Sequence, residues 1–433
     1  MHQGCKLVSG KPLTIKQISD QAYTNPSRYR WAMLLLIWLL YASFGLTAGS
    51  IPPLVEPILE DLHMSYSEMG LILGAWQFVY IFTATPLGAI VDSLGVRRSL
   101  GLGIMVVLVS LILRGLAQDF YTLLLAVALF GVGGPIISIG APKIVSLWFH
   151  GNERNIAAGI YTTGPLTGTA IALATAAGFV MPLTGSWRGI SIIYGSVIFV
   201  VAIAWWIFSK DSPLTNPKED QQKGGNNSTL IVMKELIRIR NVQVVLVMAF
   251  ATFLLNHGLG NWLPTLLIEG GMTITQAGTW AALGTAIGIS GLLIIPPIAR
   301  QGYRALTMGV LLLIAAVAGV GMISSTGSIL ILSVIISNMV RGPMMPIQTL
   351  ILMETPKIGA KRIGAAAGLF FAAAEIGGFS GPFLLGFIHD LTGSLTMGVI
   401  MLSAVSALLV LIMPLLKEIK PKLKDQSKMK TKA

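Results

Sequence analysis

The heptapeptide MSYSEMG, residues 64–70, returns in related form as MTITQAG, residues 272–278. The two copies share their polar and apolar pattern, and Gly70 and Gly278 lie 208 residues apart. Other segments keep the same offset: Pro135 with Pro343, and GGPIISIGAPKIVSLWFHGNERNIAAGIY (133–161) with RGPMMPIQTLILMETPKIGAKRIGAAAGLF (341–370). An offset shared by several segments indicates that the chain consists of two repeats in the same order.

Each repeat contains several long apolar runs. A run of about 17–25 apolar residues crosses a bilayer as a helix, and such runs predict twelve membrane spans. We place them at 31–54, 69–91, 99–117, 121–143, 156–180, 189–209, 243–267, 275–297, 304–325, 328–351, 363–387 and 395–416. Two six-helix bundles related by a parallel repeat are the architecture of many secondary transporters.

The composition supports this reading. Of the 433 residues, 54% are hydrophobic and 11% are charged, whereas soluble domains contain about 25% charged residues. The sequence therefore predicts an all-α integral membrane protein embedded in the lipid bilayer.

The net charge of +12 would suit nucleic-acid binding, but a membrane protein gathers Lys and Arg in its cytoplasmic loops, so we expect no nucleic-acid partner. The single cysteine, Cys5, excludes a disulfide framework and a thiolate metal site. We expect neither a metal nor a cofactor, and no signal peptide is visible.

The distribution of basic residues predicts the orientation. With twelve spans, 27 of the 30 Lys and Arg residues fall on the side that holds both tails, and the exceptions are Arg114, Arg188 and Arg341. Both termini are therefore expected in the cytoplasm of a cell whose plasma (inner) membrane holds the protein. The predicted units are an N-tail (1–28), a first bundle (29–209), a linker (210–242) with an amphipathic helix at Thr229–Arg240, a second bundle (243–416) and a basic C-tail (417–433).

The loop after the second span, GAIVDSLGVRR (88–98), resembles the loop signature of the major facilitator superfamily. The resemblance extends over the chain, with its twelve spans, central loop and cytoplasmic tails. It implies that this loop controls conformational gating: Gly88 lets helices approach, Asp92 sits near a helix N-terminus of the other bundle, Gly95 permits a turn, and Arg97 and Arg98 hold the cytoplasmic surface. The sequence departs from the family at Ser93, where an Arg is usual, and the second-half copy has Arg300 in place of the acid.

A second motif, GIYTTGPLTG (159–168), resembles the Gly-Pro motif of antiporters in the same superfamily, except that Thr169 follows where the family has Gly. Glycine-rich fifth and eleventh spans are similar to the nitrate/nitrite and cyanate-type branch of anion porters. The second and eighth spans, however, lack the arginine that nitrate carriers place there.

An arginine lies inside the tenth span. A charge at that depth costs at least ~2.5–3.5 kcal/mol on insertion scales and is normally directed at a cavity or a partner. Asn338, Arg341, Met345 and Gln348 are spaced to share one helix face. The family resemblance implies that the first, fourth, seventh and tenth helices line a central cavity, so we expect Asn338, Arg341 and Gln348 to contact substrate. The planar guanidinium suits an anionic group.

Glu375 is the acid at similar depth in the eleventh span. Two interpretations remain open. Glu375 forms a structural ion pair with Arg341, or it carries a proton between the two sides of the membrane during transport. Both hold if substrate or protonation breaks the pair.

Other residues of the spans complete the expected substrate site. His257 either binds substrate or relays a proton, or it is a hydrogen-bonded structural residue. Trp187 and Trp262 are expected in the interfacial aromatic belt. The remaining expected contacts are Trp38, Tyr41, Gln77, Tyr161 and Asn256.

These observations predict a monomeric secondary transporter that moves a small organic or inorganic anion by alternating access, with proton coupling or exchange. The alternative within transport is a proton-driven efflux pump for lipophilic or cationic compounds, which would favour an acid-rich cavity. A membrane sensor would usually carry a large soluble domain, and an enzyme would need a tight catalytic constellation, whereas the five histidines are scattered.

Overall fold

The computed structural model describes residues 29–211, 226–324, 326–356 and 358–418. Within these ranges all regular elements are helices, and 12 stretches are long and apolar enough to cross a membrane. The predicted all-α fold with twelve spans is therefore confirmed. Most of the predicted tails, Cys5 and linker residues 212–225 lie outside the described residues, and the predicted domain boundaries stay predictions.

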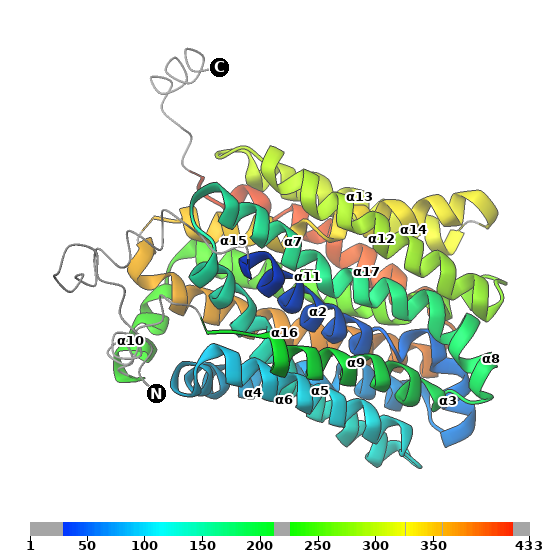
Figure 1. Cartoon of the computed structure of the whole chain (residues 1–433). Coiled ribbons are helices and arrows are strands. Elements are labelled where there is room, and N and C mark those ends of the chain that lie inside the picture. The colour runs from blue at the N-terminus through cyan, green and yellow to red at the C-terminus, as the bar shows by residue number, and fades with distance from the viewer. Residues whose placement is uncertain (1–28, 212–225, 325, 357, 419–433) are drawn as a thin grey trace, which may run out of the picture.

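Figure 1 shows the helices running roughly alongside one another. The first six spans are α2 (Tyr29–Ala48, continued by Pro52–Leu54 and α3, Val55–Leu62), α4 (Tyr66–Leu94), α5 (Val96–Gly115), α6 (Phe120–Trp148), α7 (Gly151–Thr175, continued by Ala176–Val180 and α8, Met181–Thr184) and α9 (Gly189–Phe208). The short helix α10 (Asn226–Ile237) precedes the second half. The last six spans are α11 (Arg240–Glu269), α12 (Ile274–Ile298), α13 (Arg304–Ser324), α14 with α15 (Gly327–Arg341, Met344–Glu354), α16 (Gly359–Thr392) and α17 (Thr396–Val410, followed by Met413–Leu415).

Equivalent helices of the two repeats begin with the same local structure. At α4 the Ser65 side chain accepts from the Glu68 amide, and the Glu68 carboxylate accepts from the Ser65 amide. At α12, Thr273 and Gln276 form the same reciprocal capping box. A capping box satisfies two of the backbone amides that a helix start leaves without partners. The quoted heptapeptides thus mark two equivalent helix starts.

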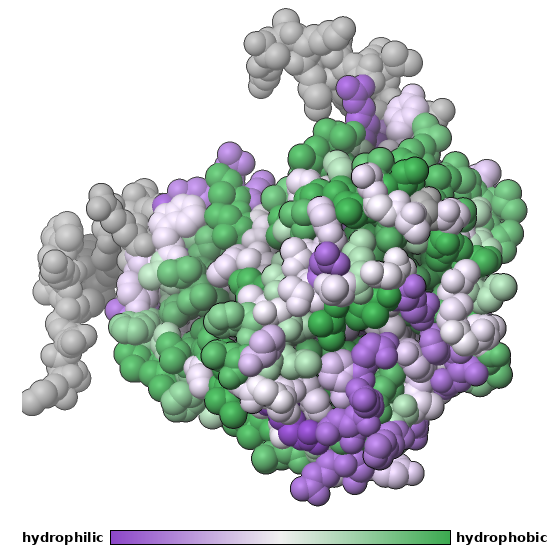
Figure 2. Space-filling view, turned by 90° about the vertical axis from the view of Figure 1, so that its right-hand side faces the viewer, coloured by the Kyte–Doolittle hydropathy of each residue, from purple (hydrophilic) through white to green (hydrophobic). Residues whose placement is uncertain are grey.

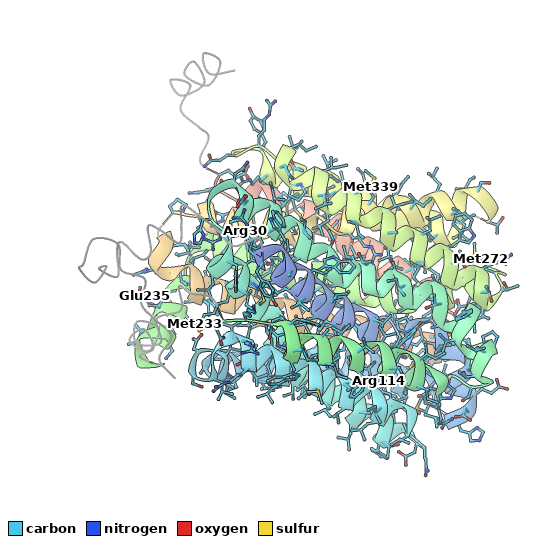
Figure 3. All side chains as sticks on the ribbon, viewed as in Figure 1. Arg30, Arg114, Met233, Glu235, Met272 and Met339 are labelled. Carbon is cyan, nitrogen blue, oxygen red and sulfur yellow. The ribbon has the colours of Figure 1, made fainter. Side chains whose placement is uncertain are left out.

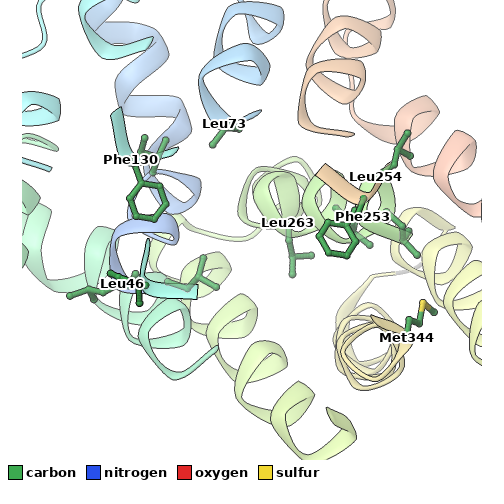
Figure 4. Packing of buried hydrophobic residues seen from close by; sticks show 14 of the residues in the cluster. Leu46, Leu73, Phe130, Phe253, Leu254, Leu263 and Met344 are labelled. Carbon is green, nitrogen blue, oxygen red and sulfur yellow. The ribbon is translucent and has the colours of Figure 1, made fainter. Parts of the chain in front are cut away.

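The helices form two bundles. In the N-terminal bundle α2 packs on α7, and α4 and α5 pack on α6; in the C-terminal bundle α11 packs on α16, and α12 and α13 pack on α14. The bundles meet along two seams, α4 with α16 and α7 with α12, which are equivalent under the repeat. Figure 4 shows buried residues of one continuous hydrophobic core to which both bundles contribute: Leu46, Leu73 and Phe130 come from the N-terminal bundle, and Phe253, Leu254, Leu263 and Met344 from the C-terminal bundle.

Both seams are tight at the end that holds the N-termini of α4 and α12, which we call the closed end. A Cβ atom on Gly70 would lie 2.6 Å from the Pro382 carbonyl oxygen, and one on Gly278 would lie 2.6 Å from that of Leu173. The main chains therefore touch directly. At the opposite, open end, a Cβ on Gly159 of α7 would meet nothing within 4 Å. In Figure 1, α3 and α8 lie toward the closed end and α10 lies at the open end.

The tenth span differs from the expected continuous helix at 328–351. Helix α14 ends at Arg341, and α15 begins at Met344 after the turn Gly342–Pro343. Proline lacks the amide hydrogen that would continue the helix, and its ring clashes with the carbonyl four residues earlier. Gly342 and Pro343 nevertheless keep helical dihedral angles, so the interruption is one of backbone hydrogen bonds and the span continues in the same direction. Arg341 lies at this interruption, half way along the span.

The predicted amphipathic helix is present as α10, shifted toward the N-terminus by about three residues at each end. Leu236 is fully buried, and the Glu235 carboxylate lies 3.1 Å from the guanidinium of Arg362 on α16. Helix α10 therefore attaches to the open end of the C-terminal bundle.

The prediction that Trp187 and Trp262 belong to an interfacial belt was wrong. Trp262 is fully buried, and its indole nitrogen donates to the Pro382 carbonyl at 2.9 Å. Trp187 is 7% exposed and donates to Asp61 at 3.1 Å. Each indole N–H donates to an acceptor on another segment of the chain. Composition alone does not reveal such contacts.

Candidate functional site

Arg341 lies inside the C-terminal bundle with an incomplete set of partners. Its side chain is 4% exposed. One terminal nitrogen donates to the Asn256 carbonyl at 3.3 Å, the other donates to Asn338 Oδ1 at 3.0 Å, and Nε has no hydrogen-bond partner. Within the described residues, no carboxylate forms an ion pair with this guanidinium. A permanent cation with a vacant donor is therefore held at mid-membrane depth.

A polar contact crosses between the bundles beside this arginine. Gln77 of α4 and His257 of α11 are joined through Nε2 and Nδ1 at 3.1 Å. His257 directly follows Asn256, whose carbonyl holds Arg341. The bridge therefore lies one residue along α11 from the guanidinium.

Glu375 of α16 belongs to the same cluster. A Cβ on Gly378 would lie 3.1 Å from His257 Cδ2, and 3.3 Å from both Gln77 Cγ and Glu375 Oε2. Glycine at 378 therefore lets these three side chains converge. Glu375 is 5% exposed, and both its Oε2 and Gln77 Oε1 are buried without a partner. Glu375 and Arg341 are not within ion-pair distance in this conformation, so each keeps a vacant polar atom.

Aromatic side chains of the N-terminal bundle lead to this cluster. Neighbouring ring centroids are 5.9 Å apart for Tyr161 and Tyr41, 5.9 Å for Tyr41 and Phe44, 5.6 Å for Phe44 and Trp76, and 5.7 Å for Trp76 and His257. Trp38 stands beside the row and donates to Thr163 at 3.0 Å. The row, which we call the aromatic row, connects three predicted site residues, Tyr161, Tyr41 and His257. Sequence reasoning omitted Phe44, which carries no polar signal.

Gln348 lies apart from the cluster. It is fully buried, and its amide nitrogen donates to Thr252 Oγ1 at 2.6 Å and to the Met248 carbonyl at 3.4 Å. These contacts join α15 to α11. Gly342 and Pro343 keep helical dihedral angles, so Gln348 lies on the side of the span that faces α11, as Arg341 does. The Gln348 Oε1 atom is buried without a hydrogen-bond partner.

The loop at 88–98 is engaged within its own bundle. Asp92 pairs with Lys143 of α6 at 2.7 Å, and among the described residues its carboxylate has no hydrogen bond to a helix start of the other bundle. Gly95 has φ +82°, the left-handed conformation that glycine adopts readily. Arg97 donates to Ser209 at 2.9 Å at the end of α9. Arg98 is exposed, and a Cβ on Gly88 would meet only Ile139 at 3.9 Å, so no close helix approach occurs at Gly88 here.

Sequence reasoning counted Arg114, near the end of the predicted span 99–117, among the basic residues on the non-cytoplasmic side. The Arg114 side chain is 3% exposed. It donates to the Thr47 carbonyl at 2.8 Å and to Ser50 Oγ at 3.2 Å, where α2 ends. Figure 3 shows Arg114 far from Arg30 along the N-terminal bundle. Arg114 therefore caps the end of α2 and has no contact with the cluster around Arg341.

The polar cluster contains one carboxyl group and one imidazole, those of Glu375 and His257. Across the part of the chain that the structure describes, no three His, Cys, Asp or Glu side chains group as metal ligands. The arrangement instead offers one fixed cation, one carboxyl group, two amides and an imidazole, which together can bind a small polar solute.

Known proteins that are similar to this chain include several named transporters. The chain is 24% identical over 363 residues to a hexuronate transporter of Bacillus subtilis, covering 78% of this chain and 82% of the relative. It is 24% identical over 370 residues to a probable nitrate transporter of Staphylococcus haemolyticus, covering 83% and 90%. The match to a probable L-galactonate transporter of Escherichia coli (27% over 180 residues) covers 42% of this chain and 39% of that protein.

A solved structure has the same fold. The bacterial homologue of the human lysosomal transporter Spinster, in an inward-facing and occupied conformation, superposes with a TM-score of 0.75 at 16% identity, covering 92% of this chain and 100% of that one. The family model described as the Major Facilitator Superfamily matches residues 37–382. The chain therefore belongs to the Major Facilitator Superfamily and is a multi-pass membrane transporter, not an enzyme.

Proposed function

We propose that this protein is a secondary transporter for a small hydroxylated organic anion of the sugar-acid type. The observation that carries the proposal is the vacant Nε of buried Arg341 beside two vacant acceptors, Gln77 Oε1 and Glu375 Oε2. A buried polar atom without a partner costs about 1–3 kcal/mol. A solute that satisfies all three atoms recovers this energy on binding.

The carboxylate of the solute is assigned to Arg341. Guanidinium–carboxylate hydrogen bonds are charge-assisted and roughly twice as strong as neutral ones. Asn338 and the Asn256 carbonyl already hold two of the terminal nitrogens. The guanidinium is thereby oriented before the solute arrives, which lowers the entropy that binding must cost.

Hydroxyl groups are assigned to the vacant acceptors. Amide and carboxylate oxygens accept hydrogen bonds and need donors. Nitrate carries no hydrogen and cannot supply them, so even with Glu375 protonated the Gln77 Oε1 atom would stay unsatisfied. A hydroxy acid supplies both the anion and the donors, and the names of the hexuronate and galactonate relatives agree with this chemistry.

The aromatic row supports the same class of solute. Ligand sites are mostly apolar, with a few placed polar groups that fix the orientation. Tyr161, Tyr41 and Trp76 offer ring faces from the N-terminal bundle, and the polar groups come mainly from the C-terminal bundle. A solute with a C–H surface and a polar edge therefore matches both bundles.

The direction of opening follows from the distribution of charge. Because Lys and Arg gather at the end that holds the loop 88–98, we assign the open end to the cytoplasm of a plasma (inner) membrane protein with cytoplasmic termini. The conformation is then inward-open, and the bundles rock about the site to expose it outside. We further propose that Glu375 carries the coupling proton, because its Oε2 has no protein partner.

The test is ligand binding to the purified protein in nanodiscs, measured by calorimetry. The probes are D-glucuronate, D-galactonate, nitrate, the uncharged sugar alcohol galactitol and a lipophilic cation. We expect the sugar acids to bind and Arg341→Gln to weaken them roughly 10- to 100-fold, the loss of one charge-assisted contact of about 1.5–3 kcal/mol. Arg300→Gln, on the exposed turn after α12, is the matched control and should leave binding unchanged.

Two outcomes would contradict the proposal. Nitrate binding as tightly as the sugar acids, with the same loss in Arg341→Gln, would make the protein an inorganic anion carrier. Binding of the lipophilic cation alone, unaffected by Arg341→Gln, would favour the efflux alternative.

A further inference from the structure

At the closed end, a carboxylate of one bundle caps a helix of the other. Asp390, in the last turn of α16, accepts hydrogen bonds from the first two amides of α4: Tyr66 N at 3.0 Å and Ser67 N at 2.8 Å. The Ser67 hydroxyl donates to the same carboxylate. Helix α4 belongs to the N-terminal bundle and α16 to the C-terminal bundle, so these bonds cross the seam between them.

These bonds complete the cap of α4. Its Ser65–Glu68 box satisfies the amides of Ser65 and Glu68, and Asp390 satisfies the two amides in between. The positive end of a helix also attracts a negative charge. Asp390 therefore gains both hydrogen bonds and the field of α4, and it does so only while the closed end is closed.

The other seam serves as an internal comparison. Helix α12 begins with the equivalent Thr273–Gln276 box, but no described side chain accepts from the amides of Ile274 and Thr275. The residue 208 positions before Asp390 is Pro182, which has no carboxylate. The fold itself therefore does not require this contact, and Asp390 is a feature added to one seam.

Other contacts gather around the same point. The His389 ring stacks on Tyr66 with centroids 3.5 Å apart, and its Nε2 lies 3.3 Å from a Glu269 oxygen. The Tyr66 hydroxyl donates to Glu56 at 2.9 Å, and the Tyr66 ring stacks on Trp262 at 5.6 Å. Figure 2 looks onto this end, where polar residues gather among apolar ones.

We propose that Asp390 is a conformational latch that holds the closed end shut by capping α4 across the bundle seam. The expected gating acid, Asp92, pairs with Lys143 inside its own bundle at the open end. In this conformation the cross-bundle cap is made by Asp390 instead. The latch breaks when the bundles separate at the closed end, so it stabilises one of the two transport conformations whatever the solute is.

The experiment measures distances between spin labels in nanodiscs without ligand, in a Cys5→Ser background. One pair, at Gln118 and Ser328, spans the bundles at the closed end; the other, at Asn152 and Gln301, spans them at the open end. All four residues are exposed. Asp390→Ala loses three charge-assisted bonds. It should raise the ratio of the conformer with the closed end apart to the conformer with the closed end shut about tenfold or more, and the open-end labels should move closer together.

Two further variants separate a latch from a general loss of stability. Asp119→Asn removes a carboxylate that caps α6 within the N-terminal bundle, at 2.8 Å from the Thr122 amide, and it should leave both distance distributions unchanged. Asp390→Asn keeps an acceptor but loses the charge, and it should shift the ratio by less than Asp390→Ala. Unchanged distances in Asp390→Ala, or equal shifts in Asp119→Asn and Asp390→Ala, would overturn the proposal.

Discussion

Gly278→Ala tests the idea that main-chain contact at the seams defines the closed end. The Cβ of alanine at 278 would lie 2.6 Å from the Leu173 carbonyl oxygen. Ordinary van der Waals contact begins at about 3.4 Å, so α12 and α7 must separate by about 0.8 Å at this point. Both partners are helix main chain, which cannot rotate away as a side chain would.

The size of the effect follows from packing. Overpacking by one carbon in a close-packed contact costs typically about 1–3 kcal/mol. Only the conformer with the closed end shut has this contact, whereas the higher helix propensity of alanine stabilises both conformers equally. A cost of about 2 kcal/mol changes the ratio of the two conformers roughly 30-fold.

The assay is the spin-label distance measurement with the pairs at 118/328 and 152/301. Gly159→Ala is the control because Gly159 lies on α7, the helix that Gly278 contacts, but toward the open end, where a Cβ meets nothing within 4 Å. We expect the closed-end distance to lengthen in Gly278→Ala and no lengthening in Gly159→Ala. An unchanged distribution of the closed-end label distances in a well-folded Gly278→Ala protein would refute the reasoning. It would show that the two helices accommodate the added methyl group without moving apart.

Three further predictions follow from other contacts. Asn241→Ala should lower the free energy of unfolding by about 2 kcal/mol, seen as a lower thermal midpoint, because the buried amide bonds both the N–H and the carbonyl of Lys417 at 3.0 Å. Gln348→Met should leave sugar-acid affinity within about twofold in calorimetry, because Gln348 bonds α11 and not the cluster; a tenfold loss would return it to the site. Glu375→Gln should abolish accumulation of labelled solute driven by a pH gradient in liposomes while exchange persists, because glutamine cannot exchange a proton at this site; accumulation that persists would exclude Glu375 as the proton carrier.

Sequence reasoning reached the fold because its signals are local and repeated. Apolar run length sets the spans, and the 208-residue offset pairs helix starts whose capping boxes the structure contains at Ser65 and Thr273. Helix periodicity also placed Asn338 and Arg341 together, and the two side chains are bonded. Arg341 and Gln348 both hydrogen-bond to α11, to residues one turn apart, as the shared face predicts. The assignment of Gln348 to the substrate site stays a prediction.

The contacts that sequence reasoning missed are those between distant segments. The Gln77–His257 bridge joins residues 180 positions apart, and the Asp390 cap joins α16 to residues more than 320 positions earlier. Neither follows from a periodicity, because each depends on how the two bundles meet. Likewise, no local pattern showed that Arg114, near the end of a predicted span, would be buried, because its burial depends on the end of α2 lying beside it.

The repeat itself helps to identify the residues of the transport site. Structural features recur at the 208-residue offset, as Gly70 and Gly278 do at the two seams. The chemical groups do not recur. The positions equivalent to Asn338, Arg341 and Glu375 hold Phe130, Gly133 and Thr167.

Phe130 packs against Phe44 and Trp76 in the N-terminal bundle, whereas the equivalent Asn338 in the C-terminal bundle bonds the cation Arg341. One scaffold is therefore used twice, with an apolar face in one copy and a polar face in the other. A symmetric solute would gain nothing from that difference. A solute with one anionic end and an apolar face contacts both bundles at once. Its full binding energy is then available only while both bundles contact it. Alternating access requires such a solute site between the two bundles.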